Sequence, residues 1–259
     1  MSESISEDES AQFSADAADL RAGLDDLAGL LAGSLELPEL LTQVAAFTVR
    51  AIPGADGAAV TLLRSGDTET GVAARAASAS FVEAIDEIQY AILDEGPCIT
   101  AVRDGRAVRS GSLGGEKMWP RFGPRVGRMG VHSVLALPLL LPDRVVGAIG
   151  VYAYAKDAFD GHAEELGELF ATPAAVAVHN AQALAEALTL NAQLRAALST
   201  RPTIDQAIGI IRARTGRSGA DAFAQLQAMS QADHRKLADV AALVVEEAVR
   251  RAQARKKPV

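Results

Sequence analysis

The chain has 259 residues, more than the usual single domain of about 100–200 residues, so its length favours two domains. Apolar residues make up 49% of it, which excludes a disordered chain and indicates a globular protein with a core of ordinary size. The single cysteine, Cys98, excludes an internal disulfide and a cysteine-cluster metal site.

The sequence predicts neither export nor membrane insertion. Its first ten residues, MSESISEDES, are acidic and polar, unlike the basic and then apolar start of a signal peptide. The longest apolar run, VLALPLLLP at 134–142, is too short to span a bilayer. Because the cysteine content gives no sign of an oxidising compartment, we expect a cytoplasmic protein that does not contact a membrane.

Charge is distributed unevenly along the chain. Residues 201–259 carry eleven Lys and Arg against six Asp and Glu, whereas residues 1–200 carry 14 against 27. A basic end on an acidic body is typical of a protein that binds a polyanion, most often a nucleic acid. The alternative is a solvated helical face followed by a basic terminus.

The first fifty residues fall into two parts. Residues 1–18 contain five acidic residues and no basic one, which predicts a disordered acidic N-terminus. From Asp19 to Arg50 apolar residues recur at helical spacing, with an interruption near Gly33. This pattern predicts two helices or one broken helix.

Strands and helices are then predicted in mixed order. Short β-like runs at 57–63 and 70–77, separated by the turn-forming Ser65-Gly66-Asp67, predict a hairpin. Residues 78–94 open with serines suited to an N-cap and continue with apolar residues three or four apart, so we expect a helix. Gly96-Pro97 ends that helix and can begin a second, short one.

A second hairpin is predicted from two apolar runs, 133–141 and 145–154, joined at Pro142-Asp143-Arg144. Together with the flanking helices it indicates an α+β domain built on an antiparallel sheet. We expect the helices on one side of that sheet, so that the other face is free to enclose a small ligand.

A long helix is predicted from Phe159 to about Thr200, in which Pro173 marks a kink or a boundary. Residues spaced alternately four and three apart form a heptad seam, which is typical of a paired helix. The seam consists of Ala177, Ala181, Leu184, Leu188, Asn191, Arg195 and Leu198. We therefore favour a homodimer, with Leu184, Leu188, Asn191 and Leu198 at its interface, over a helix packed on its own domain.

The last 59 residues have three segments of helical period, at 201–215, 218–231 and 235–254. Short connections between them predict a compact three-helix bundle. Gly209 lies in the middle of the first segment, where glycine costs about 1 kcal/mol relative to alanine. Its lack of a side chain permits another backbone to approach, either that of a packed helix or that of a bound nucleic acid.

This C-terminal segment resembles an ANTAR domain, the three-helix RNA-binding module of transcription antiterminators. The resemblance rests on spaced residues over about 45 positions: Arg201, Ile204, Gln206-Ala207, Gly209-Ile210-Ile211, Gly216, Ser218, Asp221-Ala222-Phe223, Leu226, Arg235-Lys236-Leu237 and Asp239-Val240-Ala241. Where the family has an Ala-Lys-Gly pattern, this chain has Ile208 in place of the lysine, and Arg212 could supply the charge instead.

The resemblance implies an RNA stem-loop in an mRNA leader as the partner. Exposed basic and polar residues would then contact phosphates and base edges. The candidate RNA-binding residues are Arg201, Gln206, Gly209, Arg212, Arg214, Arg217, His234, Arg235 and Lys236.

Residues 20–180 resemble a GAF domain of the type found ahead of ANTAR modules in actinobacteria. The residues that carry this resemblance include Ile85-Asp86-Glu87-Ile88-Gln89-Tyr90, Glu95-Gly96-Pro97-Cys98, Trp119-Pro120-Arg121-Phe122, Gly130-Val131-His132-Ser133 and Val146-Gly147-Ala148. The resemblance implies a sensor for an unknown small-molecule or protein signal. The candidate ligand-binding residues are Asp86, Tyr90, Cys98, Trp119 and Phe122; the sequence does not indicate a cofactor.

The sequence does not predict an active site or a metal site. The four histidines lie in different elements without metal-ligand spacing. Cys98 follows Gly-Pro near an expected helix N-terminus, a setting that can lower a thiol pKa, but a small buried apolar cysteine is the favoured interpretation. GAF-type methionine sulfoxide reductases use more than one cysteine, so we do not expect an enzyme.

The fold expected from these observations is α+β: a GAF-like antiparallel sheet flanked by helices, a long coiled-coil-like helix and a small three-helix bundle. The expected organisation is a disordered acidic N-terminus (1–18), a GAF sensor domain (19–165), a linker and dimerisation helix (166–200), an ANTAR domain (201–254) and a basic tail (255–259). We expect a signal-responsive antitermination regulator; the alternatives are a DNA-binding regulator and a protein-docking sensory module.

Overall fold

The computed structural model describes residues 2–31, 35–64 and 71–256, and it describes no side chains for residues 2–10, 31, 196–200 and 256. The expected turn at Ser65-Gly66-Asp67 lies outside the described residues. The chain divides into two compact units, residues 1–185 and residues 186–259. Each unit is described below by itself.

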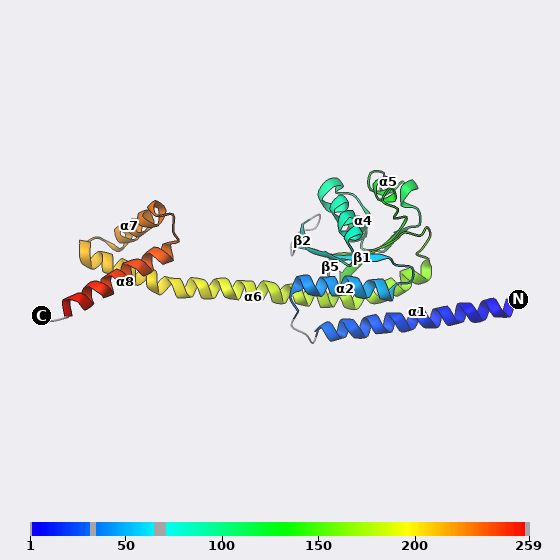
Figure 1. Cartoon of the computed structure of the whole chain (residues 1–259), viewed down its shortest axis with the longest axis horizontal. Coiled ribbons are helices and arrows are strands. Elements are labelled where there is room, and N and C mark those ends of the chain that lie inside the picture. The colour runs from blue at the N-terminus through cyan, green and yellow to red at the C-terminus, as the bar shows by residue number, and fades with distance from the viewer. Residues whose placement is uncertain (1, 32–34, 65–70, 257–259) are drawn as a thin grey trace. The chain divides into compact units, whose positions relative to one another are not determined.

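The first unit is built on one antiparallel sheet with the strand order β2-β1-β5-β4-β3 (Figure 1). The strands are β1 (Gly57–Leu63), β2 (Val72–Ala77), β3 (Val108–Ser110), β4 (Ser133–Leu141) and β5 (Arg144–Ala153). Both expected hairpins are confirmed, since β1 pairs with β2 and β4 pairs with β5. The short edge strand β3 was not expected from the sequence.

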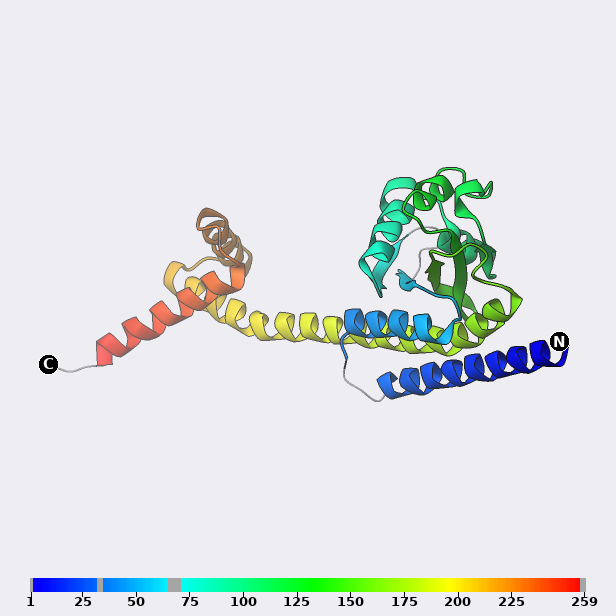
Figure 2. The ribbon, with the colours of Figure 1, turned by 45° about the vertical axis from the view of Figure 1, so that its right-hand side comes forward.

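Helices cover both faces of the sheet, so the expectation of a free face was wrong. On one face, helix α2 (Leu37–Ala51) and the first part of helix α6 (Gly161–Thr215) share a core with sheet residues such as Leu135 and Ile149. On the other face, Val82, Ile85 and Phe122 pack on Val134 and Tyr152. The apolar residues between 80 and 127 therefore close the second face, and Figures 1 and 2 show this second layer of helices.

The second layer consists of short segments. They are α3 (Ser80–Asp86), the π-helix η1 (Glu87–Leu93), α4 (Pro97–Asp104), the 3₁₀ turn η2 (Leu113–Gly115) and α5 (Phe122–Gly127). The expected helix at 78–94 is confirmed in outline, and α4 begins at Pro97 as expected. Ser78 does not cap α3, however, because its hydroxyl accepts a hydrogen bond from the Ala58 N–H of β1 at 2.9 Å.

Helix α1 spans Ser2–Leu31, whereas the sequence analysis expected disorder over residues 1–18. The helix packs against the first unit through Leu20 and Leu27, which are buried in its core. Nearer its start, the Phe13 ring lies edge-on to His162, and Asp16 Oδ2 lies 3.3 Å from His162 Nε2. These contacts give the acidic segment a surface to fold on, which its composition alone does not reveal.

Helix α6 runs without a break from Gly161 to Thr215, so Pro173 does not divide it. A proline inside a helix removes one backbone hydrogen bond. At Pro173 this loss is offset by burial, because Ala174, Ala175 and Val178 on the following turn pack in the core of the first unit. The expected boundary at residue 201 also falls inside this helix.

The second unit contains the end of α6, α7 (Gly219–Ala232) and α8 (Leu237–Lys256), so the three expected helical segments are confirmed. Ala207 and Ile211 of α6, Ala222 and Leu226 of α7, and Val240 and Ala241 of α8 share a small core. Ser218 caps α7, since its hydroxyl accepts a hydrogen bond from the Asp221 N–H at 3.2 Å.

Candidate functional site

A π-helix directs polar side chains into the first unit. In η1 the backbone N–H of Asp94 donates to the carbonyl of Gln89, five residues earlier, which is the hydrogen-bond spacing of a π-turn. The wider turn follows Asp86, which ends α3, and it contains Gln89 and Tyr90. Asp86 and Gln89 are buried. Such π-turns are frequent at functional sites.

The buried polar side chains meet around Cys98. The Cys98 N–H donates to Gln89 Oε1 at 3.0 Å, and the Cys98 thiol lies 3.9 Å from the Tyr152 hydroxyl. Gly96 makes this approach possible, because a Cβ at that position would lie 2.3 Å from Gln89 Oε1. Asp86, Tyr90 and Cys98, which the sequence analysis proposed as ligand-binding residues, are therefore neighbours in one cluster.

This cluster contains an unsatisfied carboxylate oxygen. Within the described part of the chain, Asp86 Oδ1 is buried without a hydrogen-bond partner, whereas Tyr90 interacts with the side chains of Thr61 and Cys98, and Gln89 with that of Cys98. Leaving a buried polar atom unpaired costs about 1–3 kcal/mol, so such atoms require an explanation. A bound molecule that pairs with this oxygen would recover this free energy.

Burial also shifts the pKa values of the cluster. Burial raises the pKa of the Asp86 carboxyl to about 7, although the nearby Arg75 guanidinium opposes the shift. It raises the pKa of the Cys98 thiol to about 12, so the helix N-terminus does not activate this cysteine as a thiolate. The pKa of Tyr90 is raised for the same reason.

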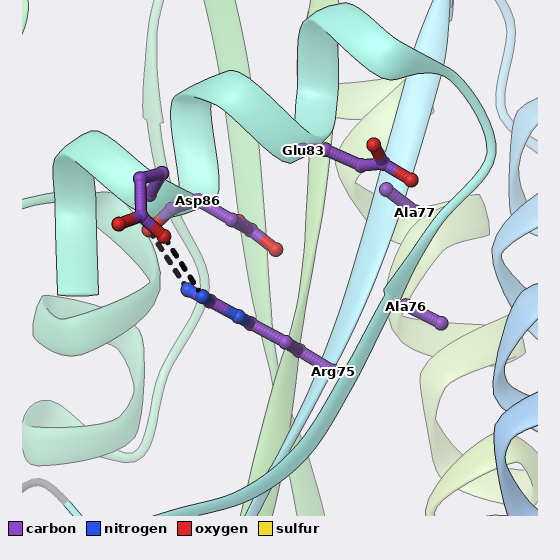
Figure 3. Close-up of a pocket in the computed structure, with 6 residues that line it drawn as sticks. Arg75, Ala76, Ala77, Glu83 and Asp86 are labelled. Carbon is purple, nitrogen blue, oxygen red and sulfur yellow. Dashed lines mark hydrogen bonds and ion pairs between the residues drawn. The ribbon is translucent and has the colours of Figure 1, made fainter. Parts of the chain in front are cut away.

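A pocket of about 290 Å³ opens beside Asp86, between strand β2 and helix α3 (Figure 3). Its lining residues are Arg75, Ala76, Ala77, Glu83, Asp86 and Glu87. Arg75 Nη2 forms an ion pair of 2.9 Å with Glu87 Oε2, and Arg75 Nη1 donates to the Asp86 carbonyl at 3.4 Å. Figure 3 shows the Asp86 side chain directed away from η1, into the space between Arg75 and Glu83.

Trp119 and Phe122 do not line this pocket. Both are buried in the same apolar cluster as Cys98, and the Trp119 Nε1–H donates to Thr100 Oγ1 at 2.9 Å. Glu95 Oε1 accepts hydrogen bonds from the N–H groups of Arg121 and Phe122, which fixes the start of α5. Their position indicates a structural role in closing the second layer.

Three charged residues of the pocket were not predicted from the sequence, namely Arg75, Glu83 and Glu87. Arg75 is the one charged residue of β2. Asp86 and Glu87 follow Glu83 by three and four residues, which is the spacing of neighbours on one helix face. This pattern could have indicated a shared site. The sequence does not show that this helix face lies beside the edge strand β2.

The second candidate site is the surface of the helical unit. All nine proposed RNA-binding residues are exposed, namely Arg201, Gln206, Gly209, Arg212, Arg214, Arg217, His234, Arg235 and Lys236. Arg217 Nη1 donates to Gln225 Oε1 of α7 at 3.2 Å. His234 adopts a left-handed backbone conformation, with φ of 51°, in the connection to α8.

Gly209 is not explained by helix packing. No described atom lies within 4 Å of the position that its Cβ would occupy, and the residue is exposed. The interpretation that a neighbouring helix requires this glycine was therefore wrong. Close approach of a bound molecule is the remaining reason that the sequence analysis gave.

Helix α8 contributes basic residues that the sequence analysis did not select. Glu247 forms ion pairs with Arg250 at 3.1 Å and with Arg251 at 2.6 Å. Arg251, and more weakly Arg250 and Arg214, lower the pKa of Glu247, so Arg214 of α6 belongs to the same charged group. The spacing of Glu247, Arg250 and Arg251 is visible in the sequence, but their proximity to Arg214 is not.

The two units define a class of regulatory protein, in which a sensory domain precedes a small helical output domain that binds RNA. A model of the GAF domain matches residues 34–179, and a model of the ANTAR domain matches residues 192–245. The chain therefore belongs to the GAF-domain family and carries an ANTAR domain after its GAF domain. The expected order of the two domains is confirmed.

A solved structure supports the fold of the first unit. A GAF domain from a phosphoenolpyruvate-protein phosphotransferase of Coxiella burnetii is similar to it, with a TM-score of 0.50, 16% identity, and coverage of 66% of this chain and 98% of that chain. A GAF domain from the corresponding Acinetobacter protein gives a TM-score of 0.48 at 15% identity, covering 64% and 97% of the two chains. No curated protein matches the sequence.

No described helix is long and apolar enough to cross a membrane. The described His, Cys, Asp and Glu side chains form no group of three or more that could hold a metal ion.

Proposed function

We propose that this protein is a signal-responsive regulator of transcription antitermination. Its ANTAR domain binds paired stem-loops in a nascent mRNA leader, and its GAF domain controls that binding in response to a small molecule or a protein. The observation that carries the proposal is the order of the two domains, together with the exposed basic residues of the second unit. Stabilising the bound RNA prevents a terminator hairpin from forming.

The RNA interface comprises the exposed surface around Arg212, Arg214, Arg217, Arg235 and Lys236. These residues contact phosphates, whereas Gln206 and His234 contact base edges in the loops. Gly209 lies on α6 between Gln206 and Arg212, where it leaves room for the RNA backbone. Arg250 and Arg251 extend this charged surface along α8.

We do not propose an enzymatic function. Both domains are regulatory, and the one cysteine has a buried thiol whose pKa is raised to about 12. A thiol in that environment is a poor nucleophile at neutral pH. The Asp86 cluster is accordingly assigned to ligand binding.

The DNA-binding alternative is disfavoured by α7. In a helix-turn-helix protein the second helix reads bases in the major groove. Helix α7, with the sequence GADAFAQLQAMSQA, has no basic residue that could read a guanine or pair with a phosphate. The other alternative is an output domain that docks onto a protein. A measurement of RNA binding distinguishes this alternative from the proposed function.

The test is a gel-shift titration of the full chain with an RNA of two adjacent stem-loops, a scrambled RNA and a duplex DNA, at two salt concentrations. We expect the paired stem-loop to bind most tightly. The double variant Arg212→Glu/Arg235→Glu should weaken binding at least tenfold and flatten its salt dependence, because phosphate contacts are lost. The matched control is Arg125→Glu/Arg128→Glu, two exposed arginines of the GAF domain. Equal binding to all three nucleic acids would contradict the proposal.

A further inference from the structure

The pocket between strand β2 and helix α3 has an excess of negative charge. Three carboxyl groups line it, from Glu83, Asp86 and Glu87, against the one guanidinium of Arg75. Glu87 pairs with Arg75 at 2.9 Å, and the same guanidinium donates to the backbone carbonyl of Asp86. Within the described ranges, no ion pair joins the side chain of Glu83 or Asp86 to a cation. The pocket therefore favours a cationic occupant.

The Asp86 side chain is buried and directed into this pocket. Asp86 is 3% exposed, and its Oδ1 has no hydrogen-bond partner among the residues that the structure describes. Figure 3 shows the side chain in the space between Arg75 and Glu83. Burial raises the pKa of the Asp86 carboxyl, the Arg75 guanidinium opposes this shift, and the Glu83 charge adds to it. Glu83 and Asp86 therefore lie within electrostatic reach of each other, and one cation can interact with both.

The pocket has room for more than a bare ion. Its volume of about 290 Å³ is close to the lower end of the range of about 300–1,000 Å³ for small-molecule sites. The described His, Cys, Asp and Glu side chains form no group of three or more that could hold a metal ion. Ala77 follows Arg75 by two residues, so its methyl group lies on the same face of β2 and gives the pocket an apolar wall. These features favour an organic cation with a short apolar part.

The Asp86 carboxyl favours an ammonium over a guanidinium. A guanidinium binds a carboxylate best through two parallel hydrogen bonds, one to each oxygen. In the part of the chain that the structure describes, Oδ1 is the one Asp86 oxygen that is buried without a partner. An ammonium is a compact charge with three donors, so it can pair with this single oxygen and direct a second donor to Glu83.

We propose that the pocket between β2 and α3 binds a small alkylammonium ion. Its ammonium group lies between the carboxyl groups of Asp86 and Glu83, and its alkyl chain lies against Ala77. The inference rests on the proposed sensory function of the GAF domain, and it assigns that sensor its class of ligand. The bound cation gives Asp86 Oδ1 a donor and reduces the repulsion between the two carboxylates.

Binding of the alkylammonium ion is coupled to a proton. The titratable and charged groups that act on or face Asp86 are Arg75 on β2, Glu83 on α3, Glu87 and Tyr90 on η1, Cys98 on α4 and Tyr152 on β5. With its pKa raised to about 7 by burial, the Asp86 carboxyl of the free protein holds a proton below neutral pH. The cation favours the ionised carboxylate, so binding at pH 6 releases that proton and binding at pH 8 does not.

The experiment titrates the full chain with propylammonium chloride, against potassium chloride at equal ionic strength. Nuclear magnetic resonance of the labelled Asp86 carboxyl carbon gives its pKa with and without the amine. We expect propylammonium to lower this pKa. We also expect it to bind about tenfold more weakly at pH 6 than at pH 8, the ratio of ionised carboxyl for a pKa of about 7.

Four further compounds identify the recognised groups. Ammonium chloride lacks the alkyl chain, 1-propanol lacks the charge, propionate reverses the charge and methylguanidinium presents a planar cation. We expect ammonium and methylguanidinium to bind more weakly than propylammonium, and the alcohol and the acid to leave the Asp86 pKa unchanged. Binding of ammonium, methylguanidinium or the alcohol as tight as that of propylammonium would overturn the proposal. No change of the pKa with propylammonium would overturn it as well.

The variant Asp86→Asn should abolish the pH dependence and weaken propylammonium binding at least tenfold at pH 8. Because the pKa of Asp86 is raised on folding, its contribution to stability falls as pH rises from 3.8 to about 7. Asp86→Asn should therefore raise the melting temperature more at pH 8 than at pH 5, which shows that the variant is folded.

The variant Glu83→Gln changes an exposed side chain, so it tests the site without removing a buried group. It should weaken propylammonium binding about two- to fivefold, as for the loss of an exposed ion pair. It should also lower the Asp86 pKa of the free protein, because the Glu83 charge helps to raise it. Glu39→Gln, which removes an exposed carboxylate of α2, is the matched control and should change neither quantity.

The readout does not involve RNA. Propylammonium binding without stem-loop binding would support the ligand class and contradict the proposed output. Stem-loop binding with no response of Asp86 to the amine would support the output and overturn the ligand class. An unchanged amine affinity in both Asp86→Asn and Glu83→Gln would also overturn it.

Discussion

Gly209 affects both the stability of helix α6 and the proposed binding of RNA. It occupies an exposed position of α6 where alanine would meet no described atom within 4 Å. Alanine is the better helix former by about 1 kcal/mol, so glycine here lowers stability without a packing reason. We therefore propose that the RNA-bound state requires glycine at this position.

Gly209→Ala is therefore expected to act in opposite directions on stability and on RNA binding. Thermal unfolding of the full chain should show stabilisation of the second unit by up to about 1 kcal/mol. The affinity for the paired stem-loop in a gel shift should fall, because the added methyl group blocks the close approach of the RNA backbone. Gly219→Ala, also at a helical glycine with open space, is the control that should leave RNA affinity unchanged.

At the scale of single residues, the sequence could predict some residues of the candidate site but not all of the residues that surround them. The motif around Asp86, Tyr90 and Cys98 indicated a ligand site, and the structure brings these three side chains together. The resemblance also included Trp119, which instead packs against Thr100. Arg75 was missed because local sequence does not show that β2 lies beside Asp86 and Glu87, which Arg75 contacts.

At the scale of helices and strands, a regular spacing of apolar residues predicted the elements correctly. Local irregularities within the elements could not be predicted in this way. Apolar spacing gave the helix at 78–94, but the change to a π-turn at Glu87 shifts only backbone hydrogen bonds. Strand β3 has three residues, too few for an alternating pattern to be recognised. Of the two possibilities at Pro173, the boundary was wrong, since flanking burial outweighs the local preference of proline.

The predicted heptad seam on α6 has a part that packs on the first unit and a part that is exposed. Ala177 is buried in the core of the first unit and Ala181 packs against that core, so these two positions face their own domain. Leu184 and Leu188 are 61% and 62% exposed, and Asn191 is also exposed. The side chain of Leu198 lies outside the described residues. The exposed leucines keep the homodimer as a proposal, with an interface that begins near Leu184.

Leu188→Glu is expected to dissociate this dimer, because a charge would be buried at the centre of an apolar seam. Sedimentation equilibrium should give the mass of two chains for the unmodified protein and of one chain for the variant. Gln193→Glu places the same charge on the opposite face of the helix and should leave the dimer intact. A monomeric unmodified protein would contradict the proposed interface.

At the scale of the whole molecule, two independent kinds of observation give the same division of roles. The acidic residues are concentrated in 1–200 and the excess of basic residues in 201–259. The GAF match at 34–179 contains the buried polar cluster, and the ANTAR match at 192–245 contains all nine proposed RNA-binding residues. The family order was visible in sequence motifs. The residues that line the sensor pocket could be identified only from the folded structure.

The charged group on α8 extends beyond the ANTAR match. Arg250 and Arg251 follow residue 245, yet they share Glu247 with Arg214 of α6. The basic surface of this chain is therefore larger than the matched domain. We therefore expect the complete second unit to take part in a salt-sensitive interaction with nucleic acid.

The central claim is tested most directly by single-round transcription in vitro from a template whose leader forms two adjacent stem-loops ahead of a terminator. The account predicts that the full chain increases read-through of the terminator and that Arg212→Glu/Arg235→Glu does not. It also predicts no increase when the stem-loop sequences are scrambled. Stem-loop binding without a change in read-through, or equal read-through with the variant, would contradict antitermination by this surface.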